Sequence, residues 1–278
     1  MRVRIVDAFT DRAFAGNPAA VCIVEGGEWP HDAWMQQLAE ELNTPMTAFA
    51  RPRADGEWDL RWFTPQLEER LCGHATLATA FLLWEDGLAG AAMRFHTLGG
   101  TLPATVTDDG MVTLDFPAAR AIVRPPIEGL AAALGVSPAE LFGTGELRDV
   151  LAVFDSEDVV RALAPRFDVL AEVMRREDIR GVAATAAGAP GADHDFVSRY
   201  FSPADGIPED PVTGSAHCAL APFWSARLGG SRLVGRQLSA RGGVVRTELA
   251  GDRVLLSGRA VTVLEGAVLD GGVIDQPY

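Results

Sequence analysis

The residues best suited to chemistry lie in two segments that begin alike. "RWFTP" at 61–65 matches "RYFSP" at 199–203 by type: arginine, an aromatic residue, phenylalanine, a hydroxyl residue and proline. A loop then leads to a glycine, Gly73 or Gly214, and from each glycine an apolar run continues to a tryptophan. The two copies are separated by about half of the chain, which indicates duplicated domains rather than a solenoid of short repeats.

Each copy predicts a strand, a loop and a buried helix that starts near the glycine. A glycine at this place lets backbone N–H groups approach a ligand closely. The N-terminus of a helix carries a partial positive charge and unpaired N–H donors. Two such termini facing each other across a domain cleft would bind a carboxylate or another anion. Titratable side chains in such a cleft favour proton-transfer chemistry.

The candidate residues are the polar and small ones at these two helix starts. Asp210 is either a turn acid or a carboxylate that handles a proton. His74 is either a helix-start residue bonded to the backbone or the partner that shares a proton with Asp210 near neutral pH. Ser215 is either a first-turn residue or one whose hydroxyl and N–H hold a carboxylate. The full set at the two starts is Cys72, Gly73, His74, Asp210, Thr213, Gly214 and Ser215.

Composition limits the class of protein. The 278 residues include 24 Lys and Arg and 38 Asp and Glu, a formal charge of −14, which disfavours nucleic acid and anionic membranes as partners. Contents of 48% hydrophobic and 22% charged residues argue against disorder. Three cysteines do not form a disulfide framework and suit a reducing compartment. With no signal-peptide pattern and no apolar run of the ~20 residues that span a membrane, a cytoplasmic protein is predicted.

The remaining pattern predicts how the chain is organised. Apolar residues at helical spacing predict a helix over 32–42, and the almost wholly apolar run 75–84 predicts a buried one. Short strand-like runs with hairpin signals fill much of the rest, which favours an α+β fold over a doubly wound sheet. The Pro-rich stretch 117–130 is the best candidate for a domain crossing. The predicted domains are 1–120 with about 266–278, and 121–265.

Three motifs together carry a family resemblance. "GNPAAVC", "LCGHAT" and "EDPVTGSAH" make the chain similar to the PhzF-like isomerases, relatives of diaminopimelate epimerase and proline racemase. The resemblance implies two pseudo-symmetric domains, each a strand-rich, barrel-like sheet around a central helix, with the site between them. It also implies no cofactor or metal, a homodimer, and isomerisation of trans-2,3-dihydro-3-hydroxyanthranilate, a small carboxylate, in phenazine biosynthesis. It places Asn17 of "GNP" at the site and supports Asp210 there.

Two positions depart from the superfamily pattern. The frame "NTPMTAF" places Met46 where the PhzF-like proteins commonly have glutamate, and a thioether cannot accept and return a proton. Cys72 stands where the racemases and epimerases hold the first of two catalytic thiols. We expect its counterpart in the second half to be the region 210–211, which has no thiol. Cys72 is then a small buried residue that lines the substrate site or is inert.

Three functions follow from these residues. The first is an isomerase of a small carboxylated substrate in which Asp210, His74 and Ser215 are catalytic. Its binding residues would be Asn17, Met46, Cys72, Gly73, Thr213 and Gly214. The second is an amino-acid racemase or epimerase, which the missing second thiol disfavours. The third is a non-catalytic relative that binds a small carboxylate, which Met46 favours.

Overall fold

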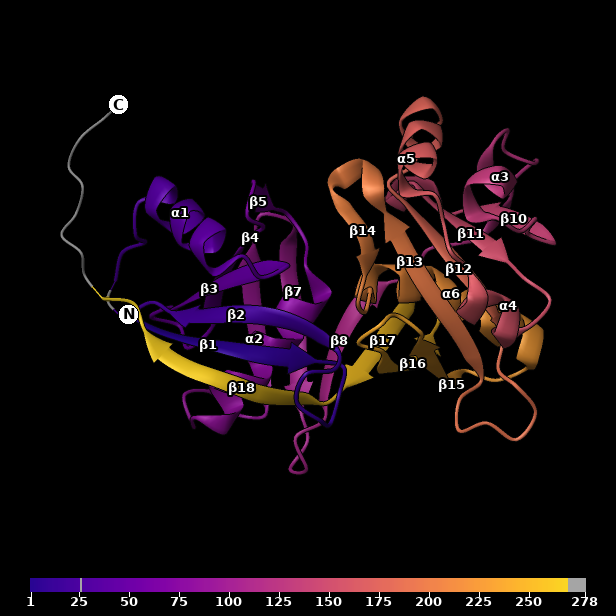
Figure 1. Ribbon diagram of the computed structural model, residues 1–278. Helices are drawn as coiled ribbons and strands as arrows, with labels where there is room; N and C mark the ends of the chain where they lie inside the picture. The colour runs from indigo at the N-terminus through magenta and orange to yellow at the C-terminus, as the bar shows by residue number, and fades with distance from the viewer. Residues whose placement is uncertain (26, 270–278) are drawn as a thin grey trace.

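The computed structural model describes residues 1–25 and 27–269 and shows two lobes side by side (Figure 1). The first lobe holds β1 (Arg2–Ala8), β2 (Asn17–Ile23), α1 (Asp32–Leu42), β3 (Met46–Pro52), β4 (Trp58–Phe63), β5 (Glu68–Glu69), α2 (Gly73–Glu85), β6 (Ala92–Thr97), β7 (Gly100–Val106), β8 (Val112–Pro117) and β18 (Ala260–Ala267). The second lobe holds β9 (Ile122–Val123), α3 (Leu130–Leu134), β10 (Glu140–Gly143), η1 (Gly145–Leu147), β11 (Asp149–Val153), α4 (Glu157–Ala162), α5 (Phe167–Arg176), β12 (Gly181–Ala187), β13 (Phe196–Ser202), η2 (Pro203–Asp205), β14 (Ile207–Asp210), α6 (Gly214–Leu228), β15 (Arg232–Gln237), β16 (Gly243–Ala250) and β17 (Arg253–Gly258).

The two lobes repeat one strand order. In the first, β2 pairs parallel with β3, β3 antiparallel with β4, and β4 borders both β5 and the parallel strand β6. In the second, β11, β12, β13, β14 and β15 make the same series of pairings. Strands β8 and β17 complete the two series and pair antiparallel with each other, with Leu114 opposite Leu256. The predicted α+β fold of two pseudo-symmetric, strand-rich halves is confirmed.

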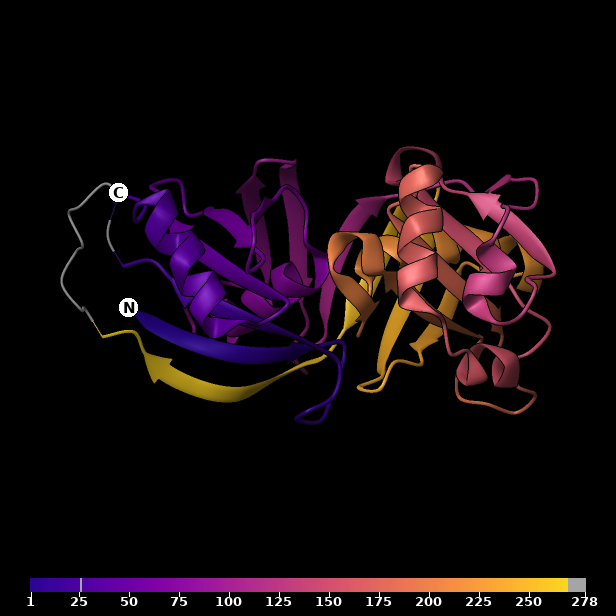
Figure 2. The same ribbon diagram turned by 45° about the horizontal axis from the view of Figure 1, so that its top comes forward.

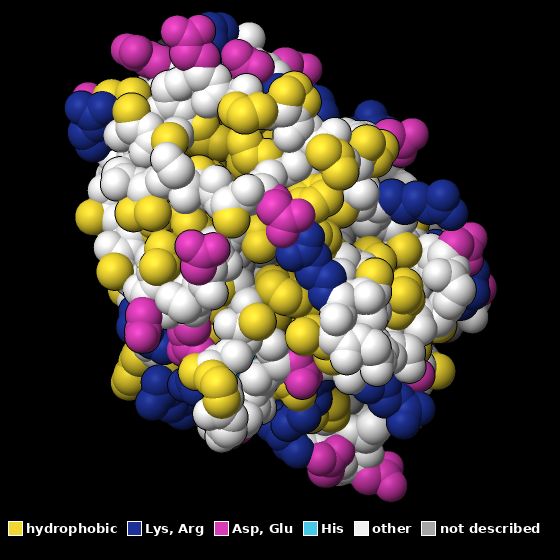
Figure 3. Space-filling model, turned by 90° about the vertical axis from the view of Figure 1, so that its right-hand side faces the viewer, with side chains coloured by type: hydrophobic (Ala, Val, Ile, Leu, Met, Phe, Trp, Pro, Cys, Tyr) yellow, Lys and Arg dark blue, Asp and Glu magenta, His cyan; other side chains and the backbone are white. Residues whose placement is uncertain are grey.

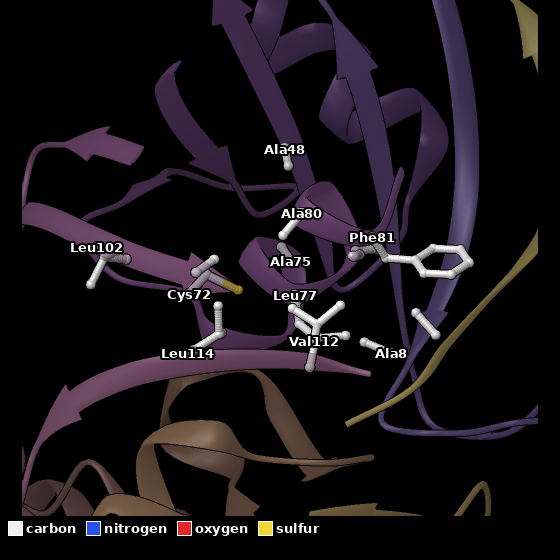
Figure 4. Packing of buried hydrophobic residues seen from close by; sticks show 14 of the residues in the cluster. Ala8, Ala48, Cys72, Ala75, Leu77, Ala80, Phe81, Leu102, Val112 and Leu114 are labelled. Carbon is white, nitrogen blue, oxygen red and sulfur yellow. The ribbon is translucent and has the colours of Figure 1, made fainter. Parts of the chain in front are cut away.

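A buried helix lies inside each lobe. Ten residues of α2, from His74 to Leu83, are buried. Because this helix is apolar on every face, it can lie only in the middle of the sheet that curves around it. Figure 4 shows α2 among inward side chains such as Ala48 of β3 and Leu114 of β8. In the second lobe α6 takes the same place and buries nine residues. The predicted buried helix over 75–84 is therefore confirmed, and it starts two residues earlier, at Gly73.

Amphipathic helices cover the outer faces of the sheets (Figure 2). Helix α1 buries Met35, Leu38 and Ala39 against a cluster that includes Phe49 of β3. On the second lobe α5 buries Leu170 with neighbouring apolar residues in the same way. Because β3 alternates its side chains between α1 and α2, its residues reach both layers. Helix α1 has the predicted bounds of 32–42.

The chain crosses between the lobes twice. Residues 118–129 lead from β8 to α3 in the second lobe, and β18 returns to pair antiparallel with β1. The division into domains near 120 and 266 stays a prediction, and its residues 270–278 lie outside the described part of the chain. Within residues 1–25 and 27–269, helices of the length and apolarity that a membrane span requires are absent.

Two hollows of the surface lie away from the predicted site. Figure 3 shows the outer end of the second lobe, where apolar side chains gather over the region of α3 and β10. A hollow of about 480 Å³ lies there, lined by residues that include Leu130 and Phe142. Another of about 320 Å³ lies beside Trp84 and Arg259. Neither is lined by a predicted site residue, so the chemistry of the side chains, and not the volume of these hollows, locates the candidate site.

Candidate active site

The N-termini of α2 and α6 meet at the junction of the lobes. A Cβ atom added to Gly73 would lie 3.7 Å from the Cα of Gly214, and one added to Gly214 would lie 3.6 Å from the Cα of Gly73. The two glycines therefore let the helix starts approach without side chains between them. The partial positive charges and the unpaired N–H groups of both helices converge here, which makes the junction suitable for an anion.

Asp210 lies at this junction, at the end of β14 and four residues before Gly214. Its Oδ1 accepts a hydrogen bond of 2.8 Å from the Asn17 side-chain amide, and its Oδ2 accepts one of 2.5 Å from the Thr213 hydroxyl. Burial raises the pKa of Asp210 to about 6, although both hydrogen bonds lower it. The group therefore titrates close to neutral pH, as a group that exchanges protons with a substrate should.

Asn17 is the first residue of β2, and the second lobe holds the loop before it in place. Arg241 donates a hydrogen bond of 2.6 Å to the buried Asp7 carboxylate of β1, and the N–H of Gly16 donates one of 2.8 Å to the carbonyl of Gly242. The Asn17 amide also donates to the carbonyl of Val212 at 2.8 Å. Its Oδ1 is buried and has no hydrogen-bond partner among the described residues. A buried acceptor of this kind is available to a ligand or to water.

His74 and Cys72 contact each other at the start of α2. The Nδ1 of His74 lies 3.4 Å from the Sγ of Cys72. Burial lowers the pKa of His74 to about 4, so the imidazole is neutral at pH 7, and burial also raises the pKa of the Cys72 thiol. No hydrogen bond joins His74 to Asp210 in the described part of the chain. Their sharing of a proton stays a prediction.

The helix caps correct the expected counterpart of Cys72. Cys72 is the N-cap residue of α2, and Thr213 is the N-cap residue of α6. Thr213, and not the region 210–211, is therefore the equivalent of Cys72. Counting from Pro65 and Pro203 does not show this, because η2 lengthens the second segment between Pro203 and β14. Figure 4 shows Cys72 among the side chains of the buried cluster around α2. Neither Cys72 nor the buried Cys218, whose pKa burial raises to about 12, is suited to act as a thiolate.

The Ser215 hydroxyl is hydrogen-bonded to an arginine, Arg180, that the sequence pattern did not predict as a site residue. Arg180 donates a hydrogen bond of 3.0 Å to the Ser215 hydroxyl and two of 2.9 and 2.6 Å to the buried Asp149 carboxylate. Tyr200 donates to the same carboxylate at 2.8 Å. The positive charge of Arg180 also lowers the pKa of Asp210. An arginine just before a strand has no distinctive spacing, so only the fold reveals it.

Met46 lies where β3 begins, opposite Ala19 of the parallel strand β2. Side chains alternate along a strand, so Ala19 and Asn17 share one face of β2. Met46, Ala19 and Cys72 belong to one buried cluster, and Met46 is 7% exposed. The position where the resemblance implies a glutamate is thus an apolar part of the inner face, on the same side of the sheet as Asn17.

The described residues, 1–25 and 27–269, contain no group of three or more His, Cys, Asp or Glu side chains that could hold a metal ion. The backbone donors of the two helix starts and the Asp210 carboxylate converge at the junction. Fold and junction thus define the class: a two-lobed α+β protein of the diaminopimelate epimerase type, with paired helix N-termini and an acid between the lobes.

Comparison with known proteins names the family. Residues 6–266 match the family model described as phenazine biosynthesis-like protein, PhzC-PhzF. The chain is 45% identical to an uncharacterized isomerase of Pseudomonas aeruginosa, over 95% of this chain and 96% of that protein. It is 42% identical to an uncharacterized isomerase of Halalkalibacterium halodurans, over 96% and 98%. A PhzF-family structure from Enterococcus faecalis superposes with a TM-score of 0.89 at 39% identity, over 96% and 99%. The chain belongs to the PhzF family of phenazine biosynthesis-like proteins.

Proposed function

We propose that the protein is a cofactor-independent isomerase that moves a proton within a small carboxylated substrate. The observation that carries this proposal is the meeting of the α2 and α6 N-termini at Gly73 and Gly214, with Asp210 beside them. The helix ends supply donors for the substrate carboxylate, and Asp210 supplies a group that titrates near neutrality. Two of the relatives are named uncharacterized isomerases, which agrees with this reaction class.

Each site residue then has a role. The N–H groups at Gly73 and Gly214 and the Ser215 hydroxyl bind the substrate carboxylate, and Arg180 orients that hydroxyl. Asp210 is the base, because Asn17 and Thr213 both donate to its oxygens and so favour its ionised form. His74, neutral at pH 7, lies against Cys72 and shapes the site on the first lobe. The sharing of a proton between His74 and Asp210 is part of this proposal.

The test uses trans-2,3-dihydro-3-hydroxyanthranilate as the probe in D₂O. We expect isomerisation with deuterium incorporated at carbon, because a carboxylate in contact with solvent exchanges its proton between turnovers. Mass spectrometry and proton NMR of the recovered substrate and the product measure both events. Binding of the probe without any exchange or turnover would contradict the isomerase and support a non-catalytic carboxylate-binding protein.

The non-catalytic alternative rests on Met46. A thioether at this position removes the group that the resemblance assigns to proton transfer, and loss of such a group costs about 10²–10⁴-fold in rate. The racemase alternative is weaker, because Thr213 stands where the second thiol would be and burial raises the pKa of Cys72. Loss of optical activity from an amino acid such as proline, measured by polarimetry, would support it.

Met46→Glu is expected to raise the rate of dihydro-hydroxyanthranilate isomerisation by at least about tenfold, because it places a carboxylate on the inner face beside Asn17. Met46→Gln, of similar size but without a titratable group, is the matched control and should give no gain. Steady-state kinetics on both folded variants measure the effect. An unchanged rate in Met46→Glu would show that this position does not face the substrate.

Assembly as a homodimer belongs to the same proposal. The 278-residue chain has a mass of 29.6 kDa, so light scattering after size exclusion should give about twice this value. A mass equal to one chain at the concentration of the activity assays would contradict it.

A further inference from the structure

We propose that Glu69 is a second catalytic carboxylate, the acid that returns a proton to the substrate after Asp210 has removed one. This inference rests on the proposed isomerase function and assigns it a residue that the family resemblance does not. It follows from the internal repeat, from strand register and from the charges around Glu69.

Counting back from the two helix starts places Glu69 and Asp210 at equivalent positions. Glu69 lies four residues before Gly73, and Asp210 lies four residues before Gly214. Glu69 is the last residue of β5 and Asp210 the last residue of β14, the short strands that precede the two buried helices. The pseudo-symmetry of the lobes therefore gives the junction one carboxylate from each half.

The residues before these two acids confirm the equivalence. Glu68 accepts two hydrogen bonds of 2.7 Å from Arg61 of β4. Glu209 accepts two of 2.7 and 2.9 Å from Arg199 of β13. The same arginine–glutamate pair thus forms in both lobes and fixes the register of each short strand. Since side chains alternate along a strand, the residue that follows each glutamate points to the opposite face.

Strand pairing shows that this opposite face is the inner one. Glu69 is opposite Trp62 of β4, and Trp62 is opposite Ala48 of β3. Residues opposite each other in antiparallel strands share a face, and Trp62 and Ala48 both belong to the buried cluster around α2 that also contains Met46. Glu69 therefore lies on the same face as Met46. Asp210 is likewise opposite Tyr200 of β13.

An unpaired donor lies next to this acid. The indole Nε1 of Trp62 is buried, and the side chain is 1% exposed, yet Nε1 has no hydrogen-bond partner among the described residues. A buried N–H without a partner is energetically unfavourable, so such groups usually meet a ligand, water or a movable side chain. Together with the unpaired Oδ1 of Asn17, Trp62 gives the inner face a donor and an acceptor that a polar substrate can use.

Charges link Glu69 to the rest of the junction. Within the described part of the chain Glu69, which is half-buried, forms no ion pair. Burial is the main cause that raises the pKa of Glu69. The charge of Asp205 raises this pKa further, and the charge of Arg180 from the other lobe lowers it. The Cys72 thiol at the start of α2 is influenced by the charges of both Asp210 and Glu69. The two carboxylates therefore lie near the same helix N-terminus, one on each lobe.

The proton balance of the reaction is simple. Ionised Asp210 takes a proton from one carbon of the substrate, the electron pair of that C–H bond shifts along the conjugated system, and protonated Glu69 gives its proton to another carbon. Asp210 then holds a proton and Glu69 has lost one, and exchange with water restores both. No oxidant, reductant or cofactor takes part, and one solvent-derived hydrogen enters each product molecule.

The experiment compares Glu69→Gln with Glu68→Gln, its neighbour on the outer face, with trans-2,3-dihydro-3-hydroxyanthranilate in D₂O. Glu69→Gln should lower product formation at least about 100-fold while deuterium exchange into recovered substrate continues, because Asp210 still removes the proton. Glu69→Asp should recover part of the rate. Glu68→Gln should keep both rates within about threefold, since glutamine still accepts a hydrogen bond from Arg61.

Product formation in Glu69→Gln within about threefold of the original rate would overturn the inference and leave the isomerase proposal intact. A second readout uses the stable aromatic analogue 3-hydroxyanthranilate, with calorimetry near pH 6 in two buffers of different ionisation enthalpy. Binding should be accompanied by proton uptake that is smaller in Glu69→Gln and unchanged in Glu68→Gln. Equal uptake in both variants would overturn the inference. No binding and no exchange by the unaltered protein would overturn the isomerase proposal as well.

Discussion

Replacement of Asp210 by asparagine is expected to lower isomerisation and solvent-deuterium exchange by about 10²–10⁴-fold, the usual effect of losing a general base. Asparagine keeps an oxygen that can accept the hydrogen bond from Asn17, so the contact between the lobes remains. What is lost is the ability to carry a proton. The measurement is the turnover of trans-2,3-dihydro-3-hydroxyanthranilate together with deuterium exchange, and full activity of a folded Asp210→Asn variant would remove Asp210 from the mechanism.

The pH dependence gives the control for this experiment. Because burial raises the pKa of Asp210 to about 6, the activity of the unaltered protein should fall as the pH is lowered through about 6 and the base becomes protonated. A raised pKa in the folded protein also means that stability contributed by this group is present below its ordinary pKa and is lost as the pH rises through about 6. Asp210→Asn should therefore be no less stable than the unaltered protein at pH 7–8.

Replacement of Arg180 by methionine is expected to have the largest effect on stability, about 3–5 kcal/mol of the free energy of unfolding. The Asp149 carboxylate is fully buried and accepts two hydrogen bonds from Arg180. Methionine would leave that charge with only the Tyr200 hydroxyl as a partner. Urea unfolding followed by circular dichroism measures the difference. The loss of unfolding free energy should become smaller as the pH is lowered, because burial raises the pKa of Asp149 and its protonated form needs no counter-charge.

Arg148→Met is the matched control for Arg180→Met. Arg148 forms its ion pair with Asp178 at 2.7 Å, with side chains 56% and 80% exposed. A solvent-exposed ion pair contributes about 0.2–1 kcal/mol to the free energy of unfolding, so Arg148→Met should be almost as stable as the original chain. Equal losses of unfolding free energy in Arg148→Met and Arg180→Met would show that the burial of Asp149 does not determine the effect of removing Arg180. The double variant Asp149→Asn with Arg180→Met should recover part of the loss.

Much of the fold could be predicted because the clearest patterns in the sequence are compatible with few structures. The apolar run that became α2 can lie only inside a sheet, and the repeat of Arg-aromatic-Phe-hydroxyl-Pro predicted two like halves. Strand β15, in which two arginines and a glycine leave only two apolar residues, was not predicted. The short strands β5 and β14 were also missed, because two to four residues rich in acids have no apolar alternation to detect.

The candidate site was predicted in part for the same reason. Glycines and acids near "LCGHAT" and "EDPVTGSAH" stand out, so Gly73, Gly214 and Asp210 were found. Glu69 was not, because comparing the halves from Pro65 and Pro203 hides its equivalence with Asp210: η2 and the turn after it lengthen the second loop. Arg180 was missed because its contacts with Ser215 and Asp149 join segments about 30 residues apart that no motif connects.

The pairing of β1 with β18 has a consequence for how the protein is made. Arg2 of β1 lies opposite Ala267 of β18, so one of the two neighbours of β1 is a strand that lies more than 250 residues later in the sequence. At ribosomal speeds of about 5–20 residues per second, β1 waits roughly 10–50 s for that neighbour to be synthesised. During this time one edge of the first sheet is open to pairing with other chains. We therefore expect β1 to be the part of the nascent first lobe that is most exposed to pairing with other chains.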